Sequence, residues 1–233
     1  MKPIQPDLKF VEDGHRYTWK GRVVPSVTQV LSRVGVITPK QELDEDGKVK
    51  TVDEWTPVGF NPAHIKEDKL ERSAEFGREF HKVAAWTLQG MNCKYDPQME
   101  PWIEQFRRFI NDYDGLDIAE YEGERLVECP LYSEKYGYCG TFDAVGKTKG
   151  GRGYIIYDWK TGSAKESFWP LQLAAYAQLV SENFGFASIY GTVVRFAEDK
   201  YQIFPVLGKF DKYMTEFQKF NSCLNVYKMV RGD

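Results

Sequence analysis

The sequence has few cysteines and no long apolar run, and each shortage excludes a class of protein. The four cysteines, Cys93, Cys129, Cys139 and Cys223, are scattered, and no two of them form a C-x-x-C pair. This spacing argues against a disulfide scaffold, a structural zinc site and an iron–sulfur cluster. No apolar run approaches the roughly 18–20 residues of a membrane helix. The opening MKPIQPDLKF resembles neither a secretory signal nor a transit peptide, so we expect a cytoplasmic protein with no membrane partner.

Neither sign of charge is in large excess, since 31 Lys and Arg residues oppose 34 Asp and Glu residues, for a net charge of −3. This balance argues against a basic coat that binds nucleic acid nonspecifically. Charge is nevertheless segregated along the chain. Residues 100–134 hold ten acidic and three basic side chains, whereas residues 147–165 hold five basic and one acidic. The pattern fits a local anion site, and it fits equally a solvated acidic face followed by a basic hairpin tip.

What the chain does have is apolar material for a core, because 42% of its 233 residues are hydrophobic and 15% are aromatic. That composition excludes a disordered, collagen-like or coiled-coil protein. In residues 8–24, apolar residues alternate with others on either side of a D-G turn signal, which predicts a β-hairpin. Ser26 and Gln29 form an S-x-x-Q capping box, which predicts the start of a helix. The polar stretch from Thr38 to Asn61, dotted with Pro and Gly, predicts a long loop or movable lid.

Further along the chain, apolar residues first recur at helical spacing. From about Asp117 apolar and polar residues alternate instead, as in strands, and helical spacing returns later in the chain. Helices before and after a central run of strands indicate one α/β or α+β domain. We expect an N-terminal elaboration of hairpin, helix and lid over residues 1–65 and a core over residues 66–233, packed as one compact unit. The predicted core elements are helices at 66–88, 99–111, 168–183 and 209–228, and strands at 118–127, 131–132, 140–145, 154–159, 187–195 and 201–206.

Two adjacent predicted strands each place a carboxylate near one end. Asp143 lies in the run G-T-F-D-A-V-G, and Asp158 lies in Y-I-I-Y-D-W-K-T-G with Lys160 two residues later. Residues two apart on a strand share a face, so Asp158 and Lys160 project together, and hairpin pairing can set Asp143 beside them. Two close carboxylates repel unless a cation lies between them, and Mg²⁺ is the usual occupant beside a phosphate. The alternative is a surface ion pair of little energetic worth.

Other polar residues fit the same chemistry. A metal ion, an activated water and the Lys160 ammonium together make a site that hydrolyses phosphodiesters. Gln172 and Tyr176 are four apart and share one face of a predicted helix. His81 follows Gly77 by about one helical turn. Each of these residues has an ordinary alternative, as part of the core or of the surface.

Taken in order, the motifs G-x-x-x-H, G-x-x-D, D-x-K and Q-L-x-x-Y resemble the RecB-like branch of the PD-(D/E)XK nuclease superfamily. The P-S-V-T-x-V-L element at residues 25–31, the G-Y-x-G-x-x-D run at 137–143 and the D-W-K-T run at 158–161 are also similar to exonucleases of the mitochondrial genome maintenance type and of phages. The resemblance implies a restriction-endonuclease-like fold, in which helices flank a central mixed sheet.

The resemblance also implies roles for the matching residues. Asp143 and Asp158 would bind one or two Mg²⁺ or Mn²⁺ ions. His81 and the backbone carbonyl of Trp159 would complete the set of metal ligands. Lys160 would assist the attacking water. These five residues, together with Gln172, form the catalytic and metal-binding set that we expect.

Further positions carry roles that remain open at the level of sequence. Gln172 would orient the site or contact the nucleic-acid backbone, with Tyr176 supporting it from the same helix face. Glu128 is an extra acidic residue that could approach the metal, although its acidic neighbours favour a solvated strand face. Ser26 and Thr28 stand where the first helix begins, and they form either a contact to substrate phosphate or a plain N-cap. The tight C-terminal cysteine group of iron–sulfur members is missing from the sequence, so we expect no such cluster.

Together with these residues, the resemblance implies a metal-dependent DNA exonuclease that acts on single strands or DNA ends. By analogy, it would serve phage DNA replication, recombination or repair. We expect a monomer whose partners are DNA and a single-strand-binding or annealing protein. Two alternatives stay open. One is a structure-selective or sequence-specific endonuclease of the same fold, and the other is a non-catalytic nucleic-acid-binding module.

Overall fold

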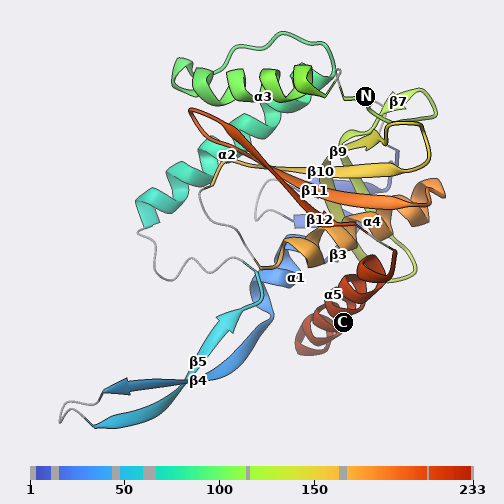
Figure 1. Ribbon diagram of the computed structural model, residues 1–233. Coiled ribbons are helices and arrows are strands. Elements are labelled where there is room, and N and C mark those ends of the chain that lie inside the picture. The colour runs from blue at the N-terminus through green and yellow to red at the C-terminus, as the bar shows by residue number, and fades with distance from the viewer. Residues whose placement is uncertain are drawn as a thin grey trace.

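The centre of the computed structural model is a five-stranded mixed sheet with the strand order β12-β11-β10-β9-β8 (Figure 1). The strands are β8 (Val127–Ser133), β9 (Tyr138–Lys147), β10 (Tyr154–Lys160), β11 (Ile189–Phe196) and β12 (Tyr201–Leu207). Only β10 and β11 run parallel, and every other neighbouring pair is antiparallel. The structure describes residues 4–11, 16–43, 48–59, 67–113, 116–162, 167–208 and 210–231.

Helices cover both faces of this sheet. They are α1 (Val27–Arg33), α2 (Glu67–Leu88), α3 (Glu100–Asp112), α4 (Trp169–Phe184) and α5 (Phe210–Arg231), with a short 3₁₀ helix, η2 (Pro97–Met99). Residues of α2 and α3 share one apolar cluster with the sheet, and residues of α1, α4 and α5 share another. The expected α+β fold, with helices flanking a central mixed sheet, is confirmed. None of the described helices is both long and apolar enough to cross a membrane.

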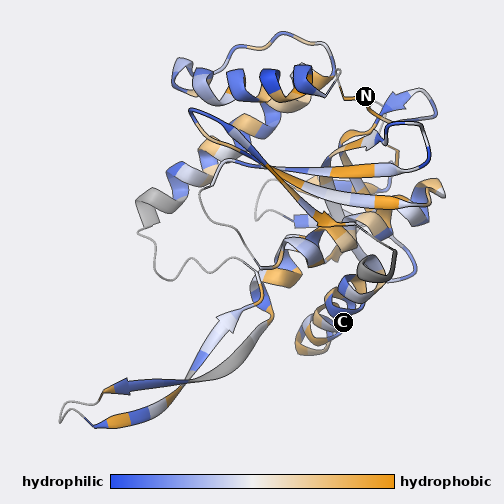
Figure 2. Ribbon diagram, in the orientation of Figure 1, coloured by the Kyte–Doolittle hydropathy of each residue, from blue (hydrophilic) through white to orange (hydrophobic). Residues whose placement is uncertain are grey.

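Aromatic packing fixes α2 and α3 on their face of the sheet. Phe80 of α2 lies with its ring centroid 5.9 Å from that of Phe106 of α3. Phe106 in turn lies 5.5 Å from Trp159 of β10, and all three side chains are fully buried. Figure 2 shows hydrophobic stretches along the central strands. Because burial of each large ring stabilises the fold by about 1.5–3 kcal/mol, this cluster holds α2 in a defined place beside the sheet.

The parallel pair β10 and β11 requires a crossover, and α4 supplies it. The helix begins with Trp169 and Pro170 soon after β10 ends. It stops at Gly185, whose φ of +68° lies in the left-handed region that glycine adopts without strain. The first turns of α4 therefore lie near the carboxyl end of β10, where the expected functional residues are.

The N-terminal residues form a small sheet of three strands. They are β1 (Leu8–Val11), β2 (Arg16–Trp19) and β3 (Arg22–Val24). The predicted hairpin is therefore part of a three-stranded antiparallel sheet, and its D-G turn signal lies outside the described residues. Trp19 stacks on Tyr132 of β8 at 4.6 Å between centroids. The predicted start of α1 is confirmed, because Ser26 and Gln29 form both hydrogen bonds of a capping box.

The prediction of a structureless loop from Thr38 to Asn61 is wrong. The structure forms a long antiparallel hairpin of β4 (Gly35–Leu43) and β5 (Val49–Pro57), which projects away from the sheet (Figure 1). Both strands contain β-branched residues that favour strands. Their charged and proline neighbours obscure that signal, and proline is tolerated because both strands are edge strands. Residues 44–47, 60 and 61 of the predicted loop lie outside the described residues.

The predicted strand at 118–127 is also wrong, since a tight turn divides it. β6 (Glu120–Tyr121) and β7 (Glu124–Arg125) pair as a short hairpin. Glu122 and Gly123 have φ of +51° and +83°, which suits the two-residue turns that match strand twist. The E-G pair is a weak form of the usual turn signal. The other predicted helices and strands of the core are found close to their expected bounds.

Candidate active site

Pairing of β9 and β10 brings Asp143 and Asp158 together, as the sequence predicts. Their antiparallel register sets Tyr157 opposite Ala144, so Asp158 follows opposite Asp143. Both carboxylates are buried. Oδ2 of Asp143 accepts a hydrogen bond of 2.5 Å from the backbone N–H of Trp159, which fixes the Asp143 side chain against β10.

Lys160 lies beside the two carboxylates. Its Nζ atom is 2.6 Å from Oδ2 of Asp158, and its side chain is only 28% exposed. A charge-assisted contact of this kind is strong when it is shielded from water. The predicted D-x-K pair is therefore a partly buried ion pair at the end of β10, rather than a solvated surface pair.

His81 reaches the same place from α2. Its Nδ1 atom lies 3.0 Å from Oδ1 of Asp143 and 3.6 Å from Oε1 of Glu128. The preceding residue, Phe80, is fully buried in the aromatic cluster and so sets the rotation of the helix. Gly77, one turn earlier, faces Thr161 just beyond Lys160. The predicted G-x-x-x-H motif thus lies against the strand that carries the D-x-K motif.

Glu128 enters the site through an irregular backbone. Its φ of +48° lies in the left-handed region, which is strained for a residue other than glycine. The paired residues Val127 and Ala144 pack in the cluster under α2 and α3, whereas Cys129 and Phe142 pack in the cluster under α4. Residues two apart on a regular strand share a face, so both strands change face at this point.

This change of face turns the carboxylate of Glu128 toward His81, and the side chain stays 33% exposed. The sequence favoured a solvated strand face for Glu128, and the structure places it in the site. No periodic or motif signal marks the position, because the left-handed backbone that redirects it is invisible in the residue pattern. Oε1 of Glu128 is buried and, among the described residues, accepts no hydrogen bond.

The carboxylates of Asp143, Asp158 and Glu128 dominate the electrostatics of the site. Burial raises the pKa of Asp158, and Asp143 raises it further against the opposing charge of Lys160. Burial also raises the pKa of Glu128, with Asp143 adding to the shift. For His81, burial alone would lower the pKa, but Asp143 and Glu128 outweigh it and raise the pKa to about 10. A set of carboxylates that raises neighbouring pKa values in this way favours a bound cation.

Donor atoms of His81, Glu128 and Asp143 all lie within 4.8 Å of one another. One imidazole nitrogen and several carboxylate oxygens form a donor set that suits Mg²⁺ or Mn²⁺. The buried Oε1 of Glu128, which lacks a hydrogen bond among the described residues, is the kind of atom that a metal ion satisfies. These residues therefore fit a divalent cation.

Gln172 and Tyr176 lie together on α4, as predicted. Nε2 of Gln172 donates a hydrogen bond of 3.2 Å to the Tyr176 hydroxyl, and both residues are buried. Burial raises the pKa of Tyr176, and the charge of Asp158 raises it further, which places this hydroxyl near the carboxylates. Oε1 of Gln172 is buried and accepts no hydrogen bond from the described residues.

The remaining predicted residues are Trp159, Ser26 and Thr28. The Trp159 ring is in the core, 5.3 Å from Tyr157, so only its backbone faces the site. Ser26 caps α1, and its hydroxyl lies 3.3 Å from that of Thr28. Among the described residues, no hydrogen bond or ion pair joins Ser26 or Thr28 to the acidic cluster. The Cys139 N–H donates to the Pro25 carbonyl at 2.9 Å, which ties the segment before α1 to β9.

This geometry agrees with what comparison of the sequence shows. The family model of the PD-(D/E)XK nuclease superfamily matches residues 58–200, which is more than half of the chain. The chain belongs to the PD-(D/E)XK nuclease superfamily. Proteins of this superfamily are nucleases that use divalent metal ions, and the matched region contains the whole acidic cluster, His81 and Lys160. Nucleic acid is accordingly the class of substrate that the family indicates.

Other comparisons add little. The crystal structure of SSO0001 shares 17% sequence identity with this nuclease-family chain, and the match covers 72% of this chain and 79% of that one. Its TM-score of 0.35 is too low for the likeness to bear on fold or function. No curated protein matches the chain in sequence.

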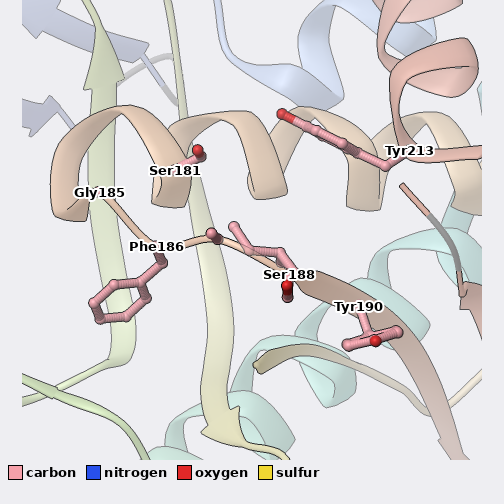
Figure 3. A pocket seen from close by; sticks show the side chains of 8 residues that line it. Ser181, Gly185, Phe186, Ser188, Tyr190 and Tyr213 are labelled. Carbon is pink, nitrogen blue, oxygen red and sulfur yellow. The ribbon is translucent and has the colours of Figure 1, made fainter. Parts of the chain in front are cut away.

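A cavity elsewhere in the molecule has no part in this cluster. It measures about 480 Å³ and lies where α4 ends and β11 begins (Figure 3). Ser181, Phe186, Ser188 and Tyr190 line it, and none of these side chains is acidic. The paired residues Tyr154 and Ile189 mark that end of the two strands, opposite to the end that carries Lys160. No described residue that lines this cavity carries a carboxylate, so the cavity offers no metal ligand of that kind.

Proposed function

We propose that the chain is a metal-dependent DNA exonuclease that acts on single strands or DNA ends. The observation that carries the proposal is the convergence of the buried Asp143 and Asp158 with the partly buried Lys160 and His81. This is the arrangement that phosphodiester hydrolysis needs: ligands for a divalent ion and a cation beside them.

Each residue has a chemical task in this proposal. Asp143, Asp158, His81, Glu128 and the Trp159 carbonyl hold the metal ion. When bound, a divalent ion lowers the pKa of a water molecule and places positive charge beside the phosphate. His81 must give up its proton to become a ligand.

The residues around these ligands position the reactants. Lys160, held by Asp158, orients the attacking water and offsets the negative charge that develops on the phosphate. Gln172 accepts a hydrogen bond through its Oε1 atom, and Tyr176 holds the amide in place. The ion pair and the buried helix face keep these groups ordered before substrate arrives.

The choice of an exonuclease rests on resemblance, not on the geometry of the acidic cluster. The P-S-V-T-x-V-L element at residues 25–31 is similar to that of mitochondrial and phage exonucleases, and it packs through Pro25 against β9. The same resemblance supports a role in phage DNA replication, recombination or repair.

Cleavage assays with Mg²⁺ or Mn²⁺ test the proposal. Linear single-stranded DNA labelled at the 5′ or the 3′ end should be degraded from an end, and EDTA should stop the reaction. Circular single-stranded DNA should stay intact, because an exonuclease needs an end. Cleavage of the circle would instead identify an endonuclease. Loss of activity is expected for Asp158→Ala and Lys160→Ala. Activity that persists in both variants, or no cleavage of any DNA by the native chain, would refute the proposal.

A further inference from the structure

Lys160 has a second cation beside it on the next strand. In the parallel pair of β10 and β11, Lys160 lies opposite Arg195. Residues paired across neighbouring strands point to the same face of a sheet. Arg195 therefore shares the face that carries Asp158 and Lys160. Gln202 of β12 lies opposite Arg195 in turn, so a polar row extends from the acidic cluster toward the edge strand, along the order β10-β11-β12 (Figure 1).

The neighbours of Arg195 hold its guanidinium in a defined position. It donates a hydrogen bond to Oε1 of Gln202 and lies 5.6 Å above the ring of Phe204. Phe204 packs against the buried Trp169 at the start of α4, with 5.4 Å between centroids. A planar guanidinium that is already oriented loses little entropy when it binds an oxyanion.

A cavity of about 420 Å³ opens beside this row. Thr161 and Gly162, directly after Lys160, line it together with Arg195, Gln202 and Trp102. Its volume lies in the range of pockets that hold small ligands. The acidic residues that also line it, Glu198 and Asp199, are exposed, and Asp199 pairs with Lys200 at 3.6 Å. The part of the cavity that Thr161 and Gly162 line is the part next to Lys160 in the chain.

We propose that Arg195 binds a phosphate of the substrate strand next to the scissile one, and that the adjoining nucleotide occupies this cavity. The inference rests on the proposed function, because it takes a nucleic-acid strand as the ligand. Arg195 lies on the strand next to Lys160, and its guanidinium is held by Gln202 and Phe204. This position beside the D-x-K pair makes Arg195 the group placed to bind the second phosphate.

Binding without cleavage tests the assignment. In an Asp158→Asn background with Mg²⁺, the affinity for a fluorescein-labelled oligothymidylate is measured by anisotropy over a range of salt. Arg195→Gln should weaken binding about tenfold or more, since hydrogen bonds to charged groups are worth about 1.5–3 kcal/mol. The slope of log affinity against log salt should fall by about 0.7, the value for one phosphate contact on a single strand. Arg195→Lys should keep that slope.

Lys147→Gln is the matched control, because it also removes one positive charge. Lys147 lies opposite Tyr154, at the end of β10 away from Lys160. In the described part of the chain, its ion-pair partner is the exposed Asp117 at 3.6 Å. Lys147→Gln should leave affinity and slope unchanged. A second measurement changes the DNA instead of the protein. One phosphate of the oligothymidylate is replaced by a neutral methylphosphonate, and the position of the replacement is varied along the strand. At one position, the replacement should weaken binding to protein that has Arg195. With Arg195→Gln, that position should make no difference.

The outcomes separate the two proposals. Unchanged affinity and slope in Arg195→Gln, or a methylphosphonate effect that does not depend on Arg195, overturns the assignment of Arg195. If the native chain cleaves no DNA, the proposed function is refuted. The binding result for Arg195 remains valid in that case, because the binding assay uses an inactive variant.

Discussion

Nδ1 of His81 lies 3.0 Å from Oδ1 of Asp143, and this contact joins helix α2 to strand β9 across 62 positions of the chain. The helix is held by Phe80 in the aromatic cluster, and the strand is held by its pairing with β8 and β10. The side chains of His81 and Asp143 are therefore in contact because the packing of α2 against the sheet places them there. A site built in this way keeps its geometry in the absence of ligand, which is what metal binding and substrate positioning require.

Asp158→Asn should inactivate the protein without destabilising it. Activity should fall by about a hundredfold or more, since metal-assisted charge stabilisation is worth several kcal/mol. The folded-state pKa of Asp158 is raised, so its charge opposes folding at any pH above the unfolded value. In EDTA at neutral pH, the neutral side chain should raise the free energy of unfolding. Urea unfolding checks this, and a clear loss of stability would contradict the repulsion inferred for the site.

Mn²⁺ should stabilise the folded protein through the acidic cluster. A ligand that binds only the folded state contributes about 2.7 kcal/mol at a hundredfold excess over its Kd. The melting temperature of the native chain should therefore rise with Mn²⁺ and return with EDTA. Asp143→Asn should abolish the rise. Asp117→Asn, which removes a carboxylate that is 70% exposed and pairs with Lys147, should keep it. A rise that persists in Asp143→Asn would place the metal elsewhere.

The sequence predicts the part of the site that depends on local pairing. Asp143 and Asp158 lie on strands joined by a short connection. The apolar patterns of the two neighbouring runs therefore suffice to predict that the strands pair and bring these residues together. His81 is different, because no local pattern fixes a helix against a strand so far along the chain, and only the order of motifs points to it. The β4–β5 hairpin was missed because charge and proline hide its β-branched residues. The turn at Glu122 and Gly123 was missed because its pair of residues is not a strong signal.

Glu128→Gln tests whether the left-handed backbone of Glu128 delivers a metal ligand. Loss of a group that supports a metal site typically costs 10–100-fold in affinity, so the affinity for Mn²⁺ should fall by about tenfold or more. Glu120→Gln, an exposed carboxylate on β6, is the control and should leave the affinity unchanged. Calorimetric titration with Mn²⁺ measures both. Equal affinities in the two variants would mean that Glu128 is only a solvated strand residue, as its acidic neighbours suggest.

Gly140→Ala should disturb the site by displacing the side chain of Tyr176. A Cβ atom at this position would lie 2.7 Å from Cε1 of Tyr176, whose ring is buried. Overpacking of this kind costs about 1–3 kcal/mol of stability. Because Tyr176 holds the amide of Gln172, the turnover rate should also fall at temperatures where the variant is fully folded. Gly208→Ala is the control, since its Cβ would meet no atom within 4 Å. Normal turnover in Gly140→Ala would show that Gln172 needs no support from Tyr176.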